Sequence, residues 1–155
     1  GWSKGWAMTG WRLGWITGPT KVMDGVKTIN VSSATHVPTF LMSAAAKALS
    51  LDEEVQVMKD AFAERRLLMH QGLSSLPGFV VPEPEGAFYI LADIAGTGLT
   101  DIEFALQALK NAQVQVIPGS LMEGGEGLIR ISYATSIANI HEGVRRLREW
   151  LESRA

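Results

Sequence analysis

The sequence lacks the residues on which most metal and disulfide chemistry depends. It contains no cysteine, which excludes a disulfide framework, a thiolate metal site and a cysteine nucleophile. Its three histidines, His36, His70 and His141, stand far apart, so we expect no metal site, and we interpret His70 as a residue at the surface or boundary of a helix. The absence of cysteine is typical of a cytoplasmic protein, which is the location we expect.

Long hydrophobic runs and a strong excess of one charge are also missing. No apolar stretch of the sequence approaches the ~20 residues that a membrane-spanning helix needs. The chain has 14 basic and 16 acidic side chains and a formal net charge of −2, and its basic residues are dispersed. We therefore expect neither a membrane nor a nucleic acid among its partners. The length suits one domain, or one domain with part of another.

Tryptophan and glycine, in contrast, are dense at the start of the chain. The first fifteen residues contain four tryptophans and four glycines, together with Lys4 and Arg12. Tryptophan is mostly buried in folded proteins, whereas lysine and arginine are mostly exposed, so the mixture suggests that both cations enter an apolar, partly dry site. A lysine in such a site loses hydration of its charged form and becomes a usable amine nucleophile. A solvated lysine in a glycine-rich loop is the alternative.

Residues 3–14, SKGWAMTGWRLG, resemble the Schiff-base segment of the fold-type I aminotransferases of class I and II, the aspartate and aromatic group. The family pattern is S/A-K-x-aromatic-x-M-T-G-W-R-(L/I)-G. The resemblance implies that Lys4 is the catalytic residue and binds pyridoxal 5'-phosphate as a Schiff base. It also implies that Arg12 binds the phosphate of this cofactor, a task that suits the arginine fork because it can meet two phosphate oxygens at once.

A second segment places an arginine inside an apolar strand pattern. Residues 128–134 alternate as a half-buried strand does, with Arg130 at the centre. An arginine in this position needs an anionic partner, because an unpaired buried charge is very costly. The segment is similar to the family pattern R-(I/L)-S-Y-A-T-S, which implies that Arg130 binds the α-carboxylate of the substrate. The residues alone leave two alternatives: an ion pair with an internal carboxylate, or a place at a sheet edge in water.

Two further segments resemble parts of the same family. Residues 84–89, PEGAFY, match a P-x-G-A-F-Y segment beside the substrate entrance. A plain strand with an aromatic side chain in the core explains this run equally well, so Tyr89 receives no catalytic role. Residues 114–120, VQVIPGS, resemble V-x-V-x-P-G-S. In the turn that follows, Met122 replaces the phenylalanine of many family members, which changes the expected shape of the substrate site.

Periodicity and turn residues predict an α/β fold. Helices are expected after Pro19, over 38–49 as a buried helix, over 50–76, after Thr100 and after Ser136. Ser50 and Thr100 each begin a capping box, and Ser136 is expected to cap the last helix. Strands are expected over 11–17, 79–81, 87–94, 114–117 and 128–134. The four later strands should form a small sheet covered by the long helix and the last two helices. Solvated helix faces are expected to carry Arg65, Arg66, Arg145, Arg146 and Arg148.

The resemblance also implies an organisation and an activity. It makes the fold the C-terminal part of a fold-type I pyridoxal-phosphate-dependent transferase, with residues 1–50 as the end of the cofactor-binding large domain and 51–155 as the small α/β domain. We expect a fragment of an aminotransferase that moves an amino group from an amino acid to a 2-oxo acid, and a homodimer in the full-length protein. The partners of the cofactor ring are expected upstream of Lys4.

Two alternatives to this activity stay open. A β-lyase or decarboxylase reaction uses the same scaffold and the same cofactor. Otherwise the chain, as given, is a non-catalytic fragment that binds a partner chain and holds no cofactor.

Overall fold

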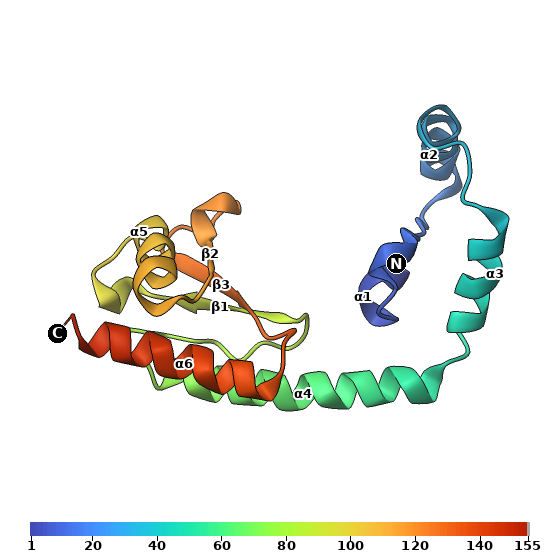
Figure 1. The fold of residues 1–155 in the computed structure, drawn as a ribbon. Coiled ribbons are helices and arrows are strands. Elements are labelled where there is room, and N and C mark those ends of the chain that lie inside the picture. The colour runs from blue at the N-terminus through green and yellow to red at the C-terminus, as the bar shows by residue number, and fades with distance from the viewer. Residues whose placement is uncertain (155) are drawn as a thin grey trace. The chain divides into compact units, whose positions relative to one another are not determined.

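The chain folds as two compact units in a computed structural model that describes residues 1–154. The first unit comprises Gly1–Met58, and the second unit begins at Lys59. Each unit has a hydrophobic core of its own. Figure 1 follows the chain through both units in sequence order.

The first unit is built from helices and loops. It contains, in chain order, α1 (Trp2–Gly5), the 3-10 helix η1 (Thr9–Trp11), α2 (Thr20–Ser33), α3 (Thr39–Ala48) and the first residues of α4 (Asp52–Ser74) (Figure 1). Pro19 and Pro38 stand directly before α2 and α3, where the missing N–H of proline costs no helical hydrogen bond. The helices predicted after Pro19 and over 38–49 are thereby confirmed.

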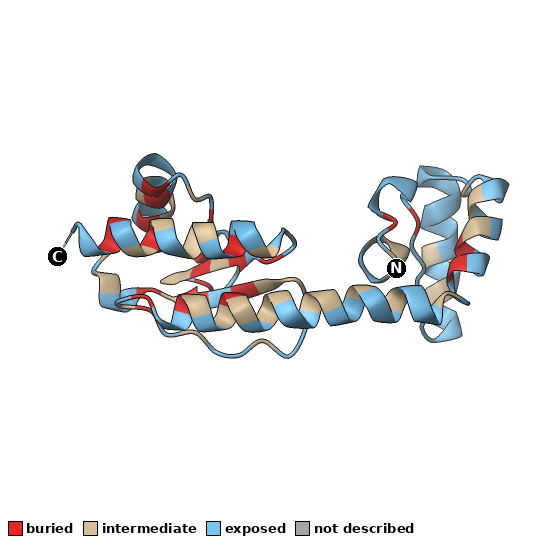
Figure 2. Cartoon of the chain, turned by 60° about the horizontal axis from the view of Figure 1, so that its bottom comes forward, coloured by how far each residue is buried: buried red, intermediate tan, exposed pale blue. Residues whose placement is uncertain are grey.

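The core of this unit is small. Met8 and Leu13 pack against Ala45 and Ala48 of α3, with a few half-buried side chains around them. Figure 2 shows exposed residues over most of α2 and α3. Phe40 is 71% exposed, so the prediction of an α3 buried all round is wrong. The reason is that residues 1–58 supply cover for one side of α3 alone.

The strand predicted over residues 11–17 is also absent. The chain leaves η1 through Arg12 and has no regular structure until α2 begins at Thr20. A strand is stabilised by hydrogen bonds to a neighbouring strand. The first unit contains no other strand, so this apolar run has nothing with which to pair.

The second unit contains a three-stranded antiparallel sheet in the order β1-β3-β2 (Figure 1). Its strands are β1 (Tyr89–Asp93), β2 (Ile117–Pro118) and β3 (Leu128–Ser132). The strands predicted over 87–94 and 128–134 are therefore confirmed with shorter bounds as β1 and β3. The strand predicted over 114–117 shares only Ile117 with β2, and the one over 79–81 is reduced to a single bridge from Val80 to Asp93. The edge strand β2 is short because Pro118 offers no N–H to a ladder.

The helices of the second unit are the main part of α4, α5 (Asp101–Gln107), which continues as the π-helix η3 (Ala108–Ala112), and α6 (Ile137–Glu152). The last two begin where the sequence predicts them. The capping box predicted at Ser50 is wrong, because α4 begins at Asp52 and the Ser50 hydroxyl donates to the Lys47 carbonyl at 2.8 Å. Thr100 and Glu103 form the predicted capping box at the start of α5, each side chain accepting the other's backbone N–H. Ser136 accepts from the Asn139 N–H at 3.2 Å and so caps α6.

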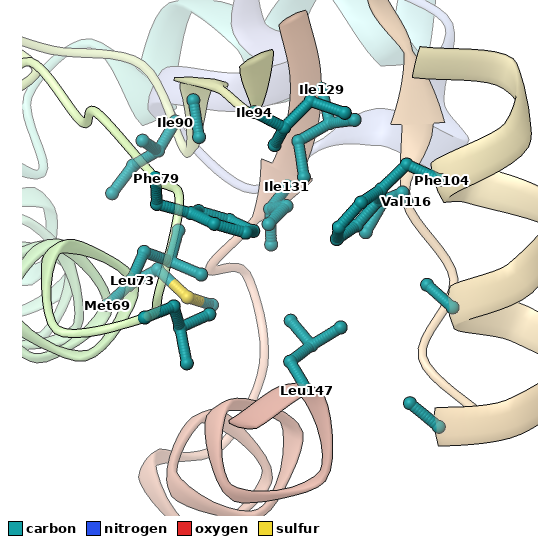
Figure 3. Packing of buried hydrophobic residues seen from close by; sticks show 14 of the residues in the cluster. Met69, Leu73, Phe79, Ile90, Ile94, Phe104, Val116, Ile129, Ile131 and Leu147 are labelled. Carbon is teal, nitrogen blue, oxygen red and sulfur yellow. The ribbon is translucent and has the colours of Figure 1, made fainter. Parts of the chain in front are cut away.

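Buried side chains from all three helices meet one face of this sheet (Figure 3). Figure 3 shows Ile129 and Ile131 of β3 directed towards the helices, with Leu147 of α6 facing them. α4 and α6 approach each other closely at Gly72, where a Cβ atom would lie 2.8 Å from Val144 Cγ2. The opposite face of the sheet holds no fully buried side chain of β1 or β3, and this is the face that carries Arg130.

The arginines of α6 lie on an outward face of the helix, as predicted, and also contact neighbouring side chains. Arg145 and Arg146 contact the Glu142 carboxylate at 2.8 and 2.7 Å. Their hydrogen bonds lower the pKa of Glu142 to about 2. Arg148 Nη2 donates to Ser75 Oγ at 2.6 Å, which ties α6 to the segment after α4.

Candidate functional site

Residues 1–15, which we call the lysine loop, fold into turns that are fastened to α3. The indole N–H of Trp2 donates to the Ala45 carbonyl at 3.0 Å. The ring of Trp2 also meets Trp15 edge-to-face, with centroids 4.4 Å apart, a favourable geometry for aromatic pairs. Trp2 and Trp15 therefore help to hold in place the loop that carries Lys4, which lies in α1.

The lysine loop contains two strained residues. Ala7 and Arg12 have φ values of 53° and 55°, in the left-handed region that costs a non-glycine residue about 1–2 kcal/mol. Arg12 Nη1 donates to the Thr9 carbonyl at 3.0 Å, a contact that helps to retain this conformation. Strain of this kind persists where the surrounding structure fixes it and is frequent at functional sites.

Lys4 and Arg12 are thus brought into one folded loop, but the first unit does not enclose them. Both side chains are exposed. The apolar, partly dry surroundings expected for the two cations are not supplied by residues 1–58. Any enclosed site at Lys4 needs groups from outside this unit.

Arg130 lies in the second unit, at the middle of the central strand β3. Its cross-strand neighbours are Leu91 on β1 and Ile117 on β2. Its guanidinium carbon lies 5.2 Å from the centroid of the Tyr89 ring, within the range of a cation–π interaction. Arg130 is half-buried, and its charged group rests on an aromatic ring in the open face of the sheet.

Neither alternative reading of Arg130 agrees with this geometry. The strand order puts β3 between β1 and β2, so Arg130 is not at a sheet edge. None of the ion pairs described for residues 1–154 includes Arg130, and its described neighbour is the Tyr89 ring. A half-buried guanidinium that rests on an aromatic ring and has no described carboxylate partner is suited to bind an anion from outside the described chain.

The turn after β2 is fixed by Asp101, a residue whose role we did not foresee. The Asp101 carboxylate is buried and accepts the Ser120 backbone N–H at 2.7 Å. This hydrogen bond lowers the pKa of Asp101. Gly119 and Gly125 touch across the turn so closely that a Cβ on Gly119 would lie 1.9 Å from the Gly125 carbonyl oxygen. Asp101 looked in the sequence like an ordinary first-turn acid of a helix.

Tyr89, to which the sequence assigns no catalytic role, belongs to the candidate site because its ring contacts Arg130. The one signal in the sequence for a role of Tyr89 is its place in the PEGAFY segment, which resembles the family. Strand register, however, is a property of the folded sheet: Tyr89 lies opposite Ser132 and Arg130 opposite Leu91. The two side chains are therefore diagonal neighbours on one face, within reach of long side chains.

Other kinds of site are not apparent in the part of the chain that the structure covers. The described residues contain no cluster of three or more histidines and acids able to hold a metal ion. None of the described helices has both the length and the apolar character to cross a membrane. A polar groove lies between η3 and the end of α6, and none of the three predicted site residues lines it.

Comparison with known proteins identifies the family. The model of the family described as "Aminotransferase class I and II" matches residues 1–147. The chain belongs to this family. The match includes the lysine loop, β1 and β3, which carry all of the residues assigned to the candidate site, and the mixed helix-and-sheet structure is that of a fold-type I aminotransferase segment.

Among curated family members, an aspartate aminotransferase of Pyrococcus horikoshii is 39% identical over 154 residues, which cover 97% of this chain and 39% of that protein. An aromatic-amino-acid aminotransferase of Thermococcus litoralis is 39% identical over 158 residues, which cover 99% of this chain and 40% of the relative. The chain therefore spans about 40% of the length of these relatives.

Solved structures of the family have the same fold. A crystal structure of an aromatic aminotransferase from Pyrococcus horikoshii matches 99% of this chain and 42% of its own, with a TM-score of 0.94 and 39% identity. An aspartate aminotransferase from Rhizobium meliloti matches 98% of this chain and 40% of its own, with a TM-score of 0.91 and 31% identity.

Proposed function

We propose that this chain forms part of an aminotransferase that moves an amino group from an amino acid to a 2-oxo acid, with pyridoxal 5'-phosphate held by Lys4. The observation that carries the proposal is Arg130. A guanidinium at the centre of a sheet, resting on Tyr89 and bound to no carboxylate of the described chain, is complementary to the α-carboxylate that every amino acid and 2-oxo acid has in common.

The donor groups of the lysine loop fit the cofactor. Pyridoxal phosphate, when bound, supplies the electron sink for the carbon that loses its proton. Its two distinctive ends are an aldehyde and a phosphate, and the loop offers one primary amine and one guanidinium. We assign the amine of Lys4 to the aldehyde carbon and afterwards to proton transfer as a base and acid. We assign the guanidinium of Arg12 to the phosphate.

The organisation of the whole protein belongs to the same proposal. We assign residues 1–50 to the end of a large cofactor-binding domain and residues 51–155 to the small domain. The exposed apolar side chains of the first unit, among them Phe40 and Trp15, support cover by further protein, including the second subunit of a homodimer. We also expect a cytoplasmic location.

Trapping the cofactor tests the role of Lys4. Purified chain is mixed with pyridoxal phosphate, reduced with borohydride and digested, and the modified lysine is located by mass spectrometry. The expected product is a pyridoxyl group on the peptide that contains Lys4, absent from a Lys4→Ala variant. Lys21→Ala, which removes another exposed lysine of the first unit, is the matched control and should keep the adduct.

The same experiment distinguishes the alternatives. Equal modification of Lys4→Ala and the unchanged chain would show that Lys4 is not the cofactor residue. A chain that gains no adduct at all favours the non-catalytic fragment, a reading that the exposed apolar surface of the first unit supports. A β-lyase or decarboxylase is separated by incubation with an amino-acid donor alone, since transamination by itself converts the cofactor stoichiometrically to pyridoxamine phosphate.

A further inference from the structure

The segment before β1 is held by a buried tyrosine that follows β3. The Tyr133 side chain is 1% exposed. Its hydroxyl donates to the Ala87 carbonyl at 2.9 Å and lies 3.3 Å from the Gly86 carbonyl. Its backbone N–H donates to the Phe88 carbonyl at 2.9 Å. Burial raises the pKa of the Tyr133 phenol against an opposing effect of Arg66, so the hydroxyl stays a donor at neutral pH.

Two side chains of α4 hold the earlier part of the same segment. Arg66 Nη1 donates to the Pro84 carbonyl at 3.0 Å. His70 Nε2 contacts the Val81 carbonyl at 3.0 Å, and it donates there because a carbonyl can only accept. Arg66 is therefore not on a solvated flank, contrary to the sequence-based prediction. Three side chains from two parts of the fold thus contact carbonyl groups within the segment 81–87.

The residue that Tyr133 holds is strained. Ala87 has a φ of 66°, a left-handed conformation that a residue with a Cβ rarely adopts. Two residues later comes Tyr89, whose ring supports the guanidinium of Arg130. Arg130 and Tyr133 belong to one stretch of chain, and each contacts one end of residues 87–89. These contacts close a small frame: Tyr133 to Ala87 at one end, and Arg130 to Tyr89 at the other.

A phenylalanine at position 133 fills the same volume, so packing does not explain the hydroxyl. We propose that Tyr133 is a positioning residue: its hydroxyl holds the Ala87 turn so that the Tyr89 ring keeps Arg130 ready to bind a substrate carboxylate. This inference rests on the proposed function, because it takes Arg130 as the carboxylate-binding group. It adds two residues, Tyr133 and Tyr89, that act through Arg130 and not on the reacting bonds.

The test is a Tyr133→Phe variant of the protein loaded with pyridoxal phosphate. The probes are L-aspartate and L-phenylalanine, each assayed as the amino donor in steady-state turnover with 2-oxoglutarate as the acceptor. Because one positioning hydrogen bond is lost, we expect KM to rise roughly 3- to 10-fold for both donors while kcat changes less than about 2-fold. A purely structural role would reduce the active fraction or Tm and leave KM unchanged.

Thr97→Val is the matched control. It removes a hydroxyl that donates to the Ile94 carbonyl at 2.7 Å, in the same unit but outside the frame, and should leave KM for both donors unchanged. If Tyr133→Phe and Thr97→Val have the same KM values, the positioning role is wrong.

Arg130→Lys, assayed in parallel, separates the two proposals. A raised KM in Arg130→Lys together with an unchanged KM in Tyr133→Phe overturns the positioning role and keeps Arg130 as the carboxylate-binding group. An unchanged KM in Arg130→Lys overturns that assignment, and the positioning role with it. Raised KM values in both variants, with Thr97→Val unchanged, support the inference.

Discussion

The two units bury their apolar side chains to very different extents. The second unit encloses a continuous core in which Leu73, Phe104 and Ile129 are completely inaccessible to solvent. The core of the first unit is limited to four buried residues, two of them alanines, and large apolar side chains such as Phe40 and Ile29 are exposed on its helices.

The comparison shows that the second unit encloses a core of its own, although Leu106 and Leu121 are exposed, whereas the first unit buries few of its apolar residues. Hydrophobic stabilisation scales with the apolar area removed from water. The second unit should therefore account for most of the chain's free energy of unfolding. The first unit should gain stability when further protein covers it, which agrees with a chain spanning about 40% of its relatives' length.

The largest contrast is expected from the same substitution made in each unit. Ile129→Ala removes a fully buried side chain from β3 and should lower the free energy of unfolding by about 2–5 kcal/mol. Ile29→Ala, at a position of α2 that is 70% exposed, should change it by no more than about 0.5 kcal/mol. Urea denaturation followed by far-UV circular dichroism measures both. Equal losses in the two variants would contradict the difference between the units.

A second pair of variants tests close packing by adding a methyl group. Gly119→Ala would place a Cβ 1.9 Å from the Gly125 carbonyl oxygen, and we expect a loss of about 1–3 kcal/mol from the overpacking. Gly25→Ala, inside α2 and with no other atom within 4 Å of the added Cβ, should stabilise the chain by about 0.5–1 kcal/mol because alanine favours the helix. Thermal unfolding gives both signs. A Gly119→Ala variant as stable as the parent would show that the turn is less tightly packed.

Short-range signals in the sequence predicted much of this fold. The capping residues Thr100 and Ser136 begin their helices as expected, because a cap depends on groups within one helical turn. The alternation around Arg130 predicted β3 for a similar reason, since side-chain direction along a strand has a period of two residues. The family resemblance of the lysine loop agrees with the comparisons.

What the sequence did not predict depends on contacts between distant residues. The Asp101–Ser120 hydrogen bond joins groups 19 positions apart, and the Tyr133–Ala87 bond joins groups 46 positions apart. No local pattern marks either pair. The strand expected over residues 11–17 also depended on a distant contact. Its apolar pattern is present in the sequence, but the first unit contains no strand with which it could pair.

The smallest effect concerns a polar contact of the second unit, the carboxylate of Asp101. The pKa of Asp101 is lowered in the folded chain, chiefly by the Ser120 N–H. Deprotonation is therefore easier in the folded than in the unfolded chain, where the pKa is about 3.9. It follows that this contact stabilises the fold above that value, and that the stabilisation is lost as the pH falls through the lower, folded-state pKa.

Asp101→Asn tests this contact, because the amide keeps a hydrogen-bond acceptor but cannot ionise. We expect the variant to be less stable than the parent by about 1 kcal/mol at pH 7, the difference between a hydrogen bond to a charged acceptor and one to a neutral acceptor. The difference should shrink as the pH is lowered below about 4, since the parent then loses its carboxylate as well. Urea denaturation at pH 7 and at a series of lower pH values measures the difference. Equal stability of the two chains at every pH would mean that the charge of Asp101 contributes nothing, and that an acceptor oxygen of this shape together with the close contact of Gly119 with Gly125 is enough to fix the turn after β2.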